Sequence, residues 1–262
     1  MRQRGAFVPK KSLGQNFLVN PNVARRIVEA CDLKPTDVIL EIGAGKGALT
    51  HLIAGKVRSV IAVEKDDHLA GQLQKDFHGT NVTIVHADIL EYPFEKIPDR
   101  VKIIGNLPYN IATPIIEKVF HYKKRVTGFY ITVQLEYGQR IAARPHNKDY
   151  GSFSCFVQYH ANPKILFKIK NASFQPVPKV QSCFLSMGLR EKPSVFVKDE
   201  KFLFGVIRAA FGHRRKTIEN SLSAILDKEK ISALLQELKI SPKLRAENLN
   251  LEDFARISDH MV

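Results

Sequence analysis

The strongest constraint on the fold is an alternation of short apolar runs with longer amphipathic runs, which begins near residue 20. Runs rich in β-branched residues, which favour strands, lie at 38–40, 60–63, 82–85, 101–104 and 129–133, with helical patterns between them. Pro21 after Asn20 is typical of a helix start, because asparagine caps the first turn and proline fits it. Strands alternating with helices predict a parallel sheet covered by helices on both faces.

The strand pattern ends near residue 194, and the remaining chain alternates helically. Further strand candidates at 153–159, 165–169 and 182–189 could complete the sheet. Beyond Lys192-Pro193-Ser194, apolar residues recur at helical spacing over 202–211, 217–226, 231–238 and 251–257. We therefore expect two domains, an α/β domain over residues 1–194 and a small all-helical domain over residues 195–262.

Glycines and carboxylates follow the predicted strands. Gly43-Ala44-Gly45-Lys46-Gly47 lies between a strand and a helix, where glycines let the backbone approach a nucleotide closely. Its spacing differs from the dinucleotide fingerprint G-x-G-x-x-G, which disfavours a nicotinamide dehydrogenase. Glu64 ends the second strand, where it could accept both ribose hydroxyls, and Asp88 follows the third, where it could accept an adenine amine. Singly, these features could be a tight turn, a surface charge and a helix cap; together they favour a nucleoside site.

The stretch Asn106-Leu107-Pro108-Tyr109-Asn110 follows the fourth predicted strand and combines an amide, a rigid turn and an aromatic ring. The exocyclic amine of adenine or cytosine is a poor nucleophile, because its lone pair is delocalised into the ring. If the Asn106 side-chain oxygen and the carbonyl of Leu107 or Pro108 each accept one N–H, that lone pair is freed. Tyr109 can then stack on the base. The alternative is an ordinary proline turn after a buried strand.

The charge balance favours a nucleic-acid partner. Of 262 residues, 40 are Lys or Arg and 26 are Asp or Glu, giving a formal net charge of +14. Charge alone names no partner, so a generic basic surface is the alternative. Cys31, Cys155 and Cys183 are too scattered for a zinc site or a disulfide framework, and we expect no metal. Without a signal peptide or a membrane-spanning apolar run, we expect a cytoplasmic protein.

On these motifs, the chain closely resembles the bacterial small-subunit rRNA adenine N6,N6-dimethyltransferases, the kasugamycin-resistance family of class I S-adenosylmethionine-dependent methyltransferases. The resemblance covers essentially the whole chain and implies a Rossmann-like sheet. Lys10–Leu18 resembles the family's N-terminal segment that folds over the cofactor, within residues 1–19. The cofactor-binding residues implied by the resemblance are Gln15, Asn16, Leu18, Gly43, Gly45, Glu64, Asp88 and Asn106.

Two further segments resemble parts of the family that face RNA. The segment 174–182 matches the family's Phe-x-Pro-x-Pro-Lys-Val-x-Ser, which implies that Phe174 packs on the target base opposite Tyr109. The alternative is a buried aromatic residue beside a proline-rich turn. Arg214, Arg215 and Lys216 match the family's basic Arg-Arg-Lys element, which implies rRNA contact. The alternative for them is a solvated, charged helix start.

Two positions depart from the family pattern. His146 stands where a glycine is common, and Leu135 replaces a lysine that is usual before Glu136. Both lie outside the cofactor and amine-binding motifs. They therefore put fine rRNA contacts in doubt and leave the chemistry unaffected.

The resemblance implies an enzyme that transfers methyl groups from S-adenosylmethionine to N6 of adenosines in small-subunit (16S) rRNA. It would dimethylate two adjacent adenosines in a hairpin loop near the 3′ end and contribute to ribosome biogenesis, with the pre-ribosomal small subunit as partner. We expect a monomer with no membrane partner. The alternatives are a large-subunit rRNA adenine methyltransferase of the macrolide-resistance type, a DNA adenine methyltransferase, whose Asn/Asp-Pro-Pro-Tyr motif has the same purpose, and a non-catalytic ribosome-assembly factor.

Overall fold

The computed structural model describes residues 14–98, 100–108 and 111–262, which pack as two compact units. Unit 1 comprises the described residues up to Gly138 together with Lys164–Leu189. Unit 2 comprises Gln139–Pro163 and Arg190–Val262. The expected boundary near residue 195 lies close to the last crossing between the units, but the sequence pattern does not reveal that 139–163 packs with the C-terminal helices. The functional division into domains stays a prediction.

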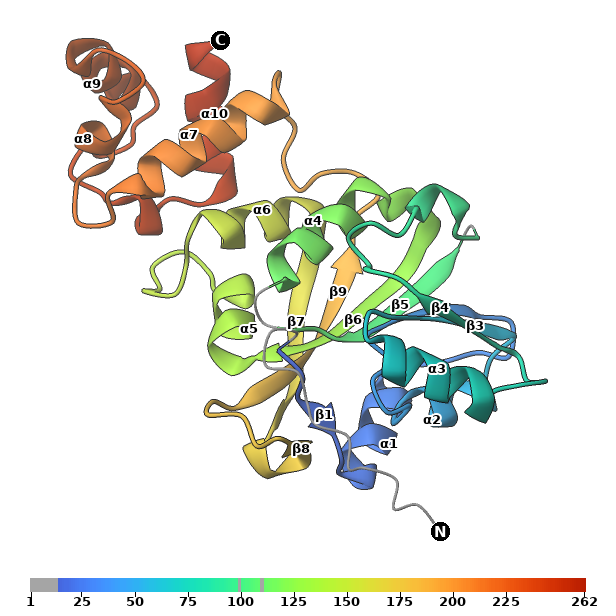
Figure 1. Ribbon diagram of the computed structural model, residues 1–262. Coiled ribbons are helices and arrows are strands. Elements are labelled where there is room, and N and C mark those ends of the chain that lie inside the picture. The colour runs from blue at the N-terminus through green and yellow to red at the C-terminus, as the bar shows by residue number, and fades with distance from the viewer. Residues whose placement is uncertain (1–13, 99, 109–110) are drawn as a thin grey trace. The chain divides into compact units, whose positions relative to one another are not determined.

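Unit 1 is built on a seven-stranded sheet with the order β4-β3-β2-β5-β6-β9-β7 among the described residues (Figure 1). The strands are β2 (Val38–Ile42), β3 (Ser59–Glu64), β4 (Val82–His86), β5 (Val101–Asn106), β6 (Val126–Gln134), β7 (Ala161–Ile169) and β9 (Ser182–Leu189). Strands β4, β3, β2, β5 and β6 pair in parallel, whereas β9 is antiparallel to β6. The expectation of a parallel sheet is thus wrong at β9, because apolar periodicity indicates a strand but not its direction.

Helices cover both faces of this sheet (Figure 1). On one face, α1 (Pro21–Ala30), α2 (Thr50–Ala54) and α3 (Asp67–Asp76) contribute to a single apolar cluster with the strands. Alternate strand residues such as Leu40 and Ile103 are buried as well, and α4 (Ala112–His121) lies on the side of the sheet opposite α1. Helix α5 (Leu135–Ala142) follows β6, and 3₁₀ turns lie at Phe94–Lys96, Lys123–Arg125 and Asn171–Ser173.

A small second sheet ties two distant parts of unit 1 together. Strand β1 (Phe17–Leu18) pairs antiparallel with β8 (Phe174–Gln175), so that Leu18 lies opposite Phe174. The Val19 N–H extends the pairing by donating to the Ser173 carbonyl at 2.8 Å. The N-terminal segment that leads to the cofactor motifs is therefore held by the segment that contains Phe174.

The helix starts after β1 and β3 are capped by side chains. Asn20 Oδ1 accepts the N–H groups of Asn22 and Val23 at 3.0 and 3.2 Å, with Pro21 in the first turn, as predicted. Asp66 Oδ1 caps α3 in the same way. Each cap contributes about 1 kcal/mol and fixes where the chain leaves the sheet edge.

Unit 2 contains α6 (Ser152–His160), α7 (Glu200–Gly212), α8 (Ile218–Leu222), α9 (Lys228–Glu237), a 3₁₀ turn (Ala246–Asn248) and α10 (Leu251–Met261). The strand expected at 153–159 is wrong, since these residues form α6. Cys155 and Tyr159, one helical turn apart, are both buried in the unit 2 core. None of the described helices has the length and apolar character that a membrane crossing needs.

The departure at His146 has a structural basis. His146 adopts φ +66°, in the left-handed region that glycine reaches without strain. Its N–H donates to the Glu247 carbonyl at 2.7 Å, and its Nδ1 lies 3.2 Å from Asn248 Nδ2. The family's usual glycine suits this backbone, and the histidine adds a side-chain hydrogen bond in its place.

Candidate active site

A cavity in unit 1 lies at the carboxyl edge of the sheet, where β2, β3, β4 and β5 end. This is the edge at which open α/β sheets bind ligands. The residues that line it are Gly14, Gln15, Asn16, Phe17, Ile42, Gly43, Gly45, Val63, Glu64, Lys65, Ala87, Asp88, Ile89, Asn106, Leu107, Pro108 and Ile111. Most of the predicted site residues are among them. Tyr109 lies outside the described residues.

The glycine turn is built around Glu64. Gly43 and Gly45 adopt φ +72° and +59°, which non-glycine residues rarely reach, and a Cβ at Gly45 would lie 3.1 Å from the Phe17 ring. The Gly45 N–H donates to Glu64 Oε2 at 2.8 Å, and the Asp66 N–H donates to Oε1 at 2.8 Å. Each carboxylate oxygen has a further lone pair, so Glu64 is a rigid double acceptor in the lining of the cavity.

Asp88 is a second acceptor, and it has a cationic neighbour. Its Oδ2 lies 2.6 Å from Lys65 Nζ, and its Oδ1 accepts the Leu90 N–H at 2.9 Å. Partial burial pushes the pKa of Asp88 upward, but the Lys65 hydrogen bond, the Leu90 N–H and the charges of Lys65 and Lys118 outweigh it, so the net shift is downward. Asp88 is therefore ionised at neutral pH. Lys65, which sequence reasoning missed, lines the cavity beside it.

Residues 14–17 form one wall of the cavity. Gln15 Nε2 donates to Asp66 Oδ2 at 3.2 Å, and the Asn16 carbonyl accepts from Asn106 Nδ2 at 3.0 Å. Phe17 and Leu18 are both buried, but Phe17 lines the cavity whereas Leu18 belongs to the apolar core. Consecutive residues of a strand face opposite sides, so the Phe17 side chain faces the cavity and the Leu18 side chain faces the core. The cofactor contact of Leu18 stays a prediction.

Asn106 is the point where the N-terminal segment meets the predicted amine-binding motif. Because its Nδ2 donates to the Asn16 carbonyl, its Oδ1 is left as the acceptor of the amide. The Leu107 N–H donates to the Thr132 carbonyl at 3.1 Å, and the Pro108 carbonyl accepts the Ile111 N–H at 3.2 Å as α4 begins. The turn is thereby fixed at both ends, and the carbonyls of Leu107 and Pro108 both remain candidates for the second acceptor.

Phe174 is not among the residues that line the cavity. Its ring is 2% exposed and packs in the core cluster that contains Leu18, Ile169 and Phe184. This burial is what the alternative interpretation expects, a buried aromatic residue beside a proline-rich turn. The contact of Phe174 with a target base stays a prediction. Its partner in the expected base clamp, Tyr109, lies outside the described residues.

A buried carboxyl group that sequence reasoning missed lies behind the glycine turn. Glu41, two residues before Gly43, is 2% exposed, and its Oε2 has no hydrogen-bond partner within the described residues. Burial raises the pKa of Glu41 to about 7; Thr50 opposes this shift and the Glu64 carboxylate adds to it. A carboxylate inside an otherwise apolar strand, directly before the glycine motif, was the signal that could have found it.

The predicted rRNA-binding residues lie in unit 2, in the turn between α7 and α8. Arg214, Arg215 and Lys216 are all exposed. Arg214 Nη2 donates to the carbonyls of Lys148 and Tyr150 and lies 3.7 Å from Glu247 Oε2. Arg214 therefore also holds the 148–150 loop in place, a role that the basic motif alone does not reveal.

Comparison with known proteins identifies the family of this chain. The family model described as ribosomal RNA adenine dimethylase matches residues 6–261. The chain belongs to this family. It is 40% identical over 271 residues to ribosomal RNA small subunit methyltransferase A of Moorella thermoacetica, covering 98% of this chain and 94% of that protein. It is also 40% identical over 272 residues to the protein of that name from Streptococcus sanguinis, covering 98% and 93%. The predicted family is confirmed.

Solved structures confirm the fold class. A dimethyladenosine transferase from Plasmodium falciparum superposes with a TM-score of 0.79 at 22% identity, covering 92% of this chain and 95% of that chain. The 23S rRNA methyltransferase ErmE superposes with a TM-score of 0.73 at 24% identity, covering 93% and 98%. The chain therefore has a Rossmann-like methyltransferase sheet followed by a C-terminal helical region.

Proposed function

We propose that this enzyme transfers methyl groups from S-adenosylmethionine to N6 of adenosines in small-subunit (16S) rRNA. Its targets would be two adjacent adenosines in a hairpin loop near the 3′ end. The observation that carries the proposal is the Asn106 amide, which the Asn16 carbonyl orients so that its oxygen is left as an acceptor at the cavity. The choice of the small subunit rests on the names of the 40%-identical relatives.

The residues that line the cavity suit S-adenosylmethionine. When bound, this donor supplies a methyl group that is already electrophilic, so the protein has mainly to position the reactants. Gly43 and Gly45 leave space for its close approach. Glu64, whose two oxygens are held by backbone N–H groups, would accept the ribose hydroxyls, and Asp88 would accept the adenine amine.

The target amine would be held by two acceptors. Asn106 Oδ1 would take one N–H of N6, and the carbonyl of Leu107 or Pro108 would take the other, which draws the nitrogen toward tetrahedral geometry. The proton would leave after methyl transfer, to Asn106 or to water. A second methylation requires N6-methyladenosine to enter with its methyl group turned away. The adenosine must also be unstacked to reach the site.

Recruitment of the rRNA would use the basic surface of unit 2. Arg215 and Lys216 are exposed and are free of the contacts that engage Arg214. We further propose that the enzyme acts as a cytoplasmic monomer on the pre-ribosomal small subunit and contributes to ribosome biogenesis. Sedimentation tests the proposed partner, because the protein should sediment together with small-subunit precursors.

Replacing Asn106 tests the chemistry. Asn106→Ala should lower the rate of methyl transfer to small-subunit particles by about a hundredfold or more, since one positioned acceptor is lost. Affinity for the particle should stay near that of the wild type, because it comes mainly from phosphate contacts. Asn81→Ala is the matched control, since that amide also donates to backbone carbonyls but lies away from the cavity. Near-wild-type transfer by Asn106→Ala would refute the role.

Three substrates separate the proposed activity from its rivals. Labelled methyl groups should appear in small-subunit particles and be absent from large-subunit particles and duplex DNA. Label confined to large-subunit particles would indicate the macrolide-resistance type, and label confined to DNA would indicate a DNA methyltransferase. Tight particle binding without label would indicate a non-catalytic assembly factor.

A further inference from the structure

A second concave site lies in unit 1 at the opposite, amino edge of the sheet. It is formed where β2, β3, β5 and β6 begin, and its lining residues are Thr36, Asp37, Val38, Arg58, Arg100, Lys102 and Thr127. The two ends of β5 lie roughly 17 Å apart at the rise of a β-strand. The amino-edge pocket is therefore separate from the cavity that contains Asn106.

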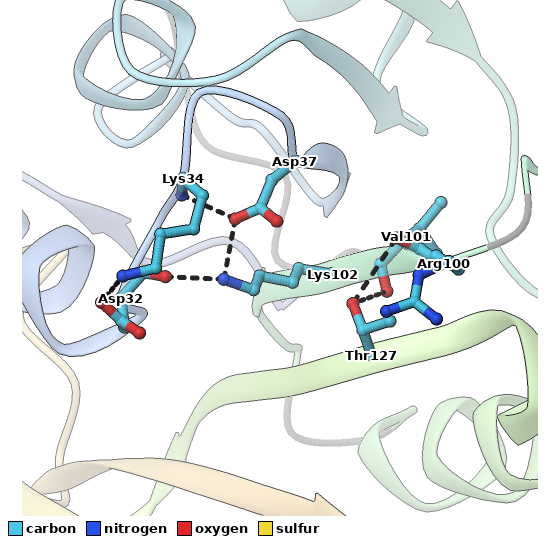
Figure 2. Close-up of polar contacts among 7 residues, drawn as sticks. All are labelled: Asp32, Lys34, Asp37, Arg100, Val101, Lys102 and Thr127. Atoms are coloured by element: carbon cyan, nitrogen blue, oxygen red, sulfur yellow. Dashed lines mark hydrogen bonds and ion pairs between the residues drawn. The ribbon is translucent and has the colours of Figure 1, made fainter.

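The floor of the amino-edge pocket is a partly buried ion pair. Lys102 Nζ lies 2.7 Å from Asp37 Oδ2 and donates to the Asp32 carbonyl at 2.6 Å (Figure 2). The same Asp37 oxygen accepts the Lys34 N–H at 2.7 Å. The side chains of Lys102 and Asp37 are only 12% and 16% exposed. The one carboxylate among the lining residues is thus neutralised by its own lysine.

Two arginines of the pocket have no anionic partner in the part of the chain that the structure describes. Arg58 and Arg100 are both exposed, and within the described residues no ion pair or hydrogen bond engages either guanidinium. Two guanidinium groups at one hollow repel each other, and their planar N–H forks match the oxygens of a phosphate. The chemistry of the pocket therefore fits a phosphate group.

Arg100 stands in a backbone conformation that does not suit arginine. Its φ is +66°, in the left-handed region that is strained for side chains with a Cβ. Thr127 Oγ1 lies 3.2 Å from the Val101 carbonyl and 3.5 Å from the Arg100 carbonyl, to which it donates (Figure 2). Glycine would adopt this conformation without strain, so the backbone conformation does not favour an arginine at this position.

We propose that the amino-edge pocket binds a backbone phosphate of the rRNA substrate through Arg58 and Arg100, at a distance from the target adenosine. The formal net charge of +14 favours RNA over a small anion as the source of that phosphate. A ribosomal particle is large enough to contact both edges of the sheet. The inference rests on the proposed function, because the partner is the same rRNA.

The test is a double variant that removes both charges and relaxes the backbone, Arg58→Gln with Arg100→Gly. Its affinity for small-subunit particles should fall about tenfold, and the slope of log affinity against log salt should become shallower by about 1. Affinity for S-adenosylmethionine and the melting temperature should not fall. The control, Arg25→Gln with Lys75→Gln, removes two exposed charges of unit 1 from α1 and α3.

Three results would overturn parts of this picture, and they can be told apart. Particle binding and a salt slope equal to those of the control would overturn the phosphate site. A second result would assign the pocket to a small anion instead. Millimolar inorganic phosphate would raise the melting temperature of the wild type but not that of the double variant, and the double variant would bind particles as tightly as the control. Absence of methylation by the wild-type protein, with the binding difference intact, would overturn the proposed function and leave the pocket standing.

Discussion

The two ends of β5 present opposite chemistry. At its amino end, Arg100 offers N–H donors beside Arg58. At its carboxyl end, Asn106 offers an acceptor in the same cavity as Glu64 and Asp88. Ribose hydroxyls and adenine amines are donors, whereas phosphates are acceptors. One sheet would therefore separate the proposed recognition of nucleosides from the proposed recognition of the RNA backbone.

The lysine–aspartate pairs at the two edges differ in how exposed their lysines are. Lys102 and Asp37 are 12% and 16% exposed, and the pair belongs to the floor of its pocket. Lys65 is 55% exposed and Asp88 17%, and both line the cavity. A partly buried pair fixes local structure, whereas an exposed lysine can leave its partner at little cost. Asp88 is thus available to a ligand and Asp37 is not.

The largest effect should follow from changing Glu64. Glu64→Gln places an amide where two backbone N–H groups and two ribose hydroxyls need acceptors, so affinity for S-adenosylmethionine should fall on the order of a thousandfold. Binding to small-subunit particles should be unchanged, the reverse of the arginine double variant. Calorimetric titration with the donor measures the first, and filter binding the second. A variant that lost both affinities equally would break the division between the edges.

Glu41→Gln should produce an intermediate effect that depends on pH. The folded-state pKa of about 7 exceeds the unfolded value of about 4.3, so the folded protein retains a proton that the unfolded chain releases. This contribution to stability is present in full below the unfolded pKa and is lost as the pH rises to about 7. Relative to the wild type, the variant should gain up to about 3 kcal/mol of unfolding free energy at pH 8 and little at pH 5.

Denaturant unfolding of both proteins at the two pH values measures this difference. Leu40→Met is a suitable control, since it changes the neighbouring buried residue of β2 without altering any charge. A Glu41→Gln difference that is the same at pH 5 and pH 8 would show that the Glu41 carboxyl does not titrate in this window.

The smallest effect should come from Lys65→Met, which keeps the aliphatic part of the side chain. It removes the cation that competes with the expected adenine amine for the Asp88 carboxylate. S-adenosylmethionine should therefore bind up to about fivefold more tightly, and its affinity should depend less on salt. The donor affinity at low and high salt measures the change. Weaker binding at both salt concentrations would mean that Lys65 itself holds the ligand.

Much of unit 1 could be predicted from the sequence, because buried strands and capped helices leave local patterns. Asn20 and Pro21 predicted the start of α1, and the β-branched runs predicted β2 to β6. The helix α6 was missed, because its aromatic residues favour a strand by local propensity. Its packing against distant helices of unit 2, which buries Cys155 and Tyr159, leaves no local pattern in the sequence. The direction of β9 was missed because pairing partners determine it.

The residues of the candidate site likewise divide into those that the local sequence predicts and those that depend on tertiary pairing. Gly43, Glu64, Asp88 and Asn106 could be placed at the cavity because strand ends locate them without tertiary knowledge. The position of Phe17 at the cavity and the burial of Phe174 depend on the β1–β8 pairing, which no local pattern specifies. The left-handed φ of His146 and Arg100 is likewise set by turns.

The central claim is that this enzyme dimethylates adenosines of 16S rRNA through Asn106. Mass mapping of methylated adenosines in 16S rRNA tests it most directly, in cells that lack this protein and receive either the wild type or Asn106→Ala. We predict two adjacent N6,N6-dimethyladenosines near the 3′ end, present only with the wild type. Dimethylation that persists without the protein, or that Asn106→Ala restores in full, would contradict the account.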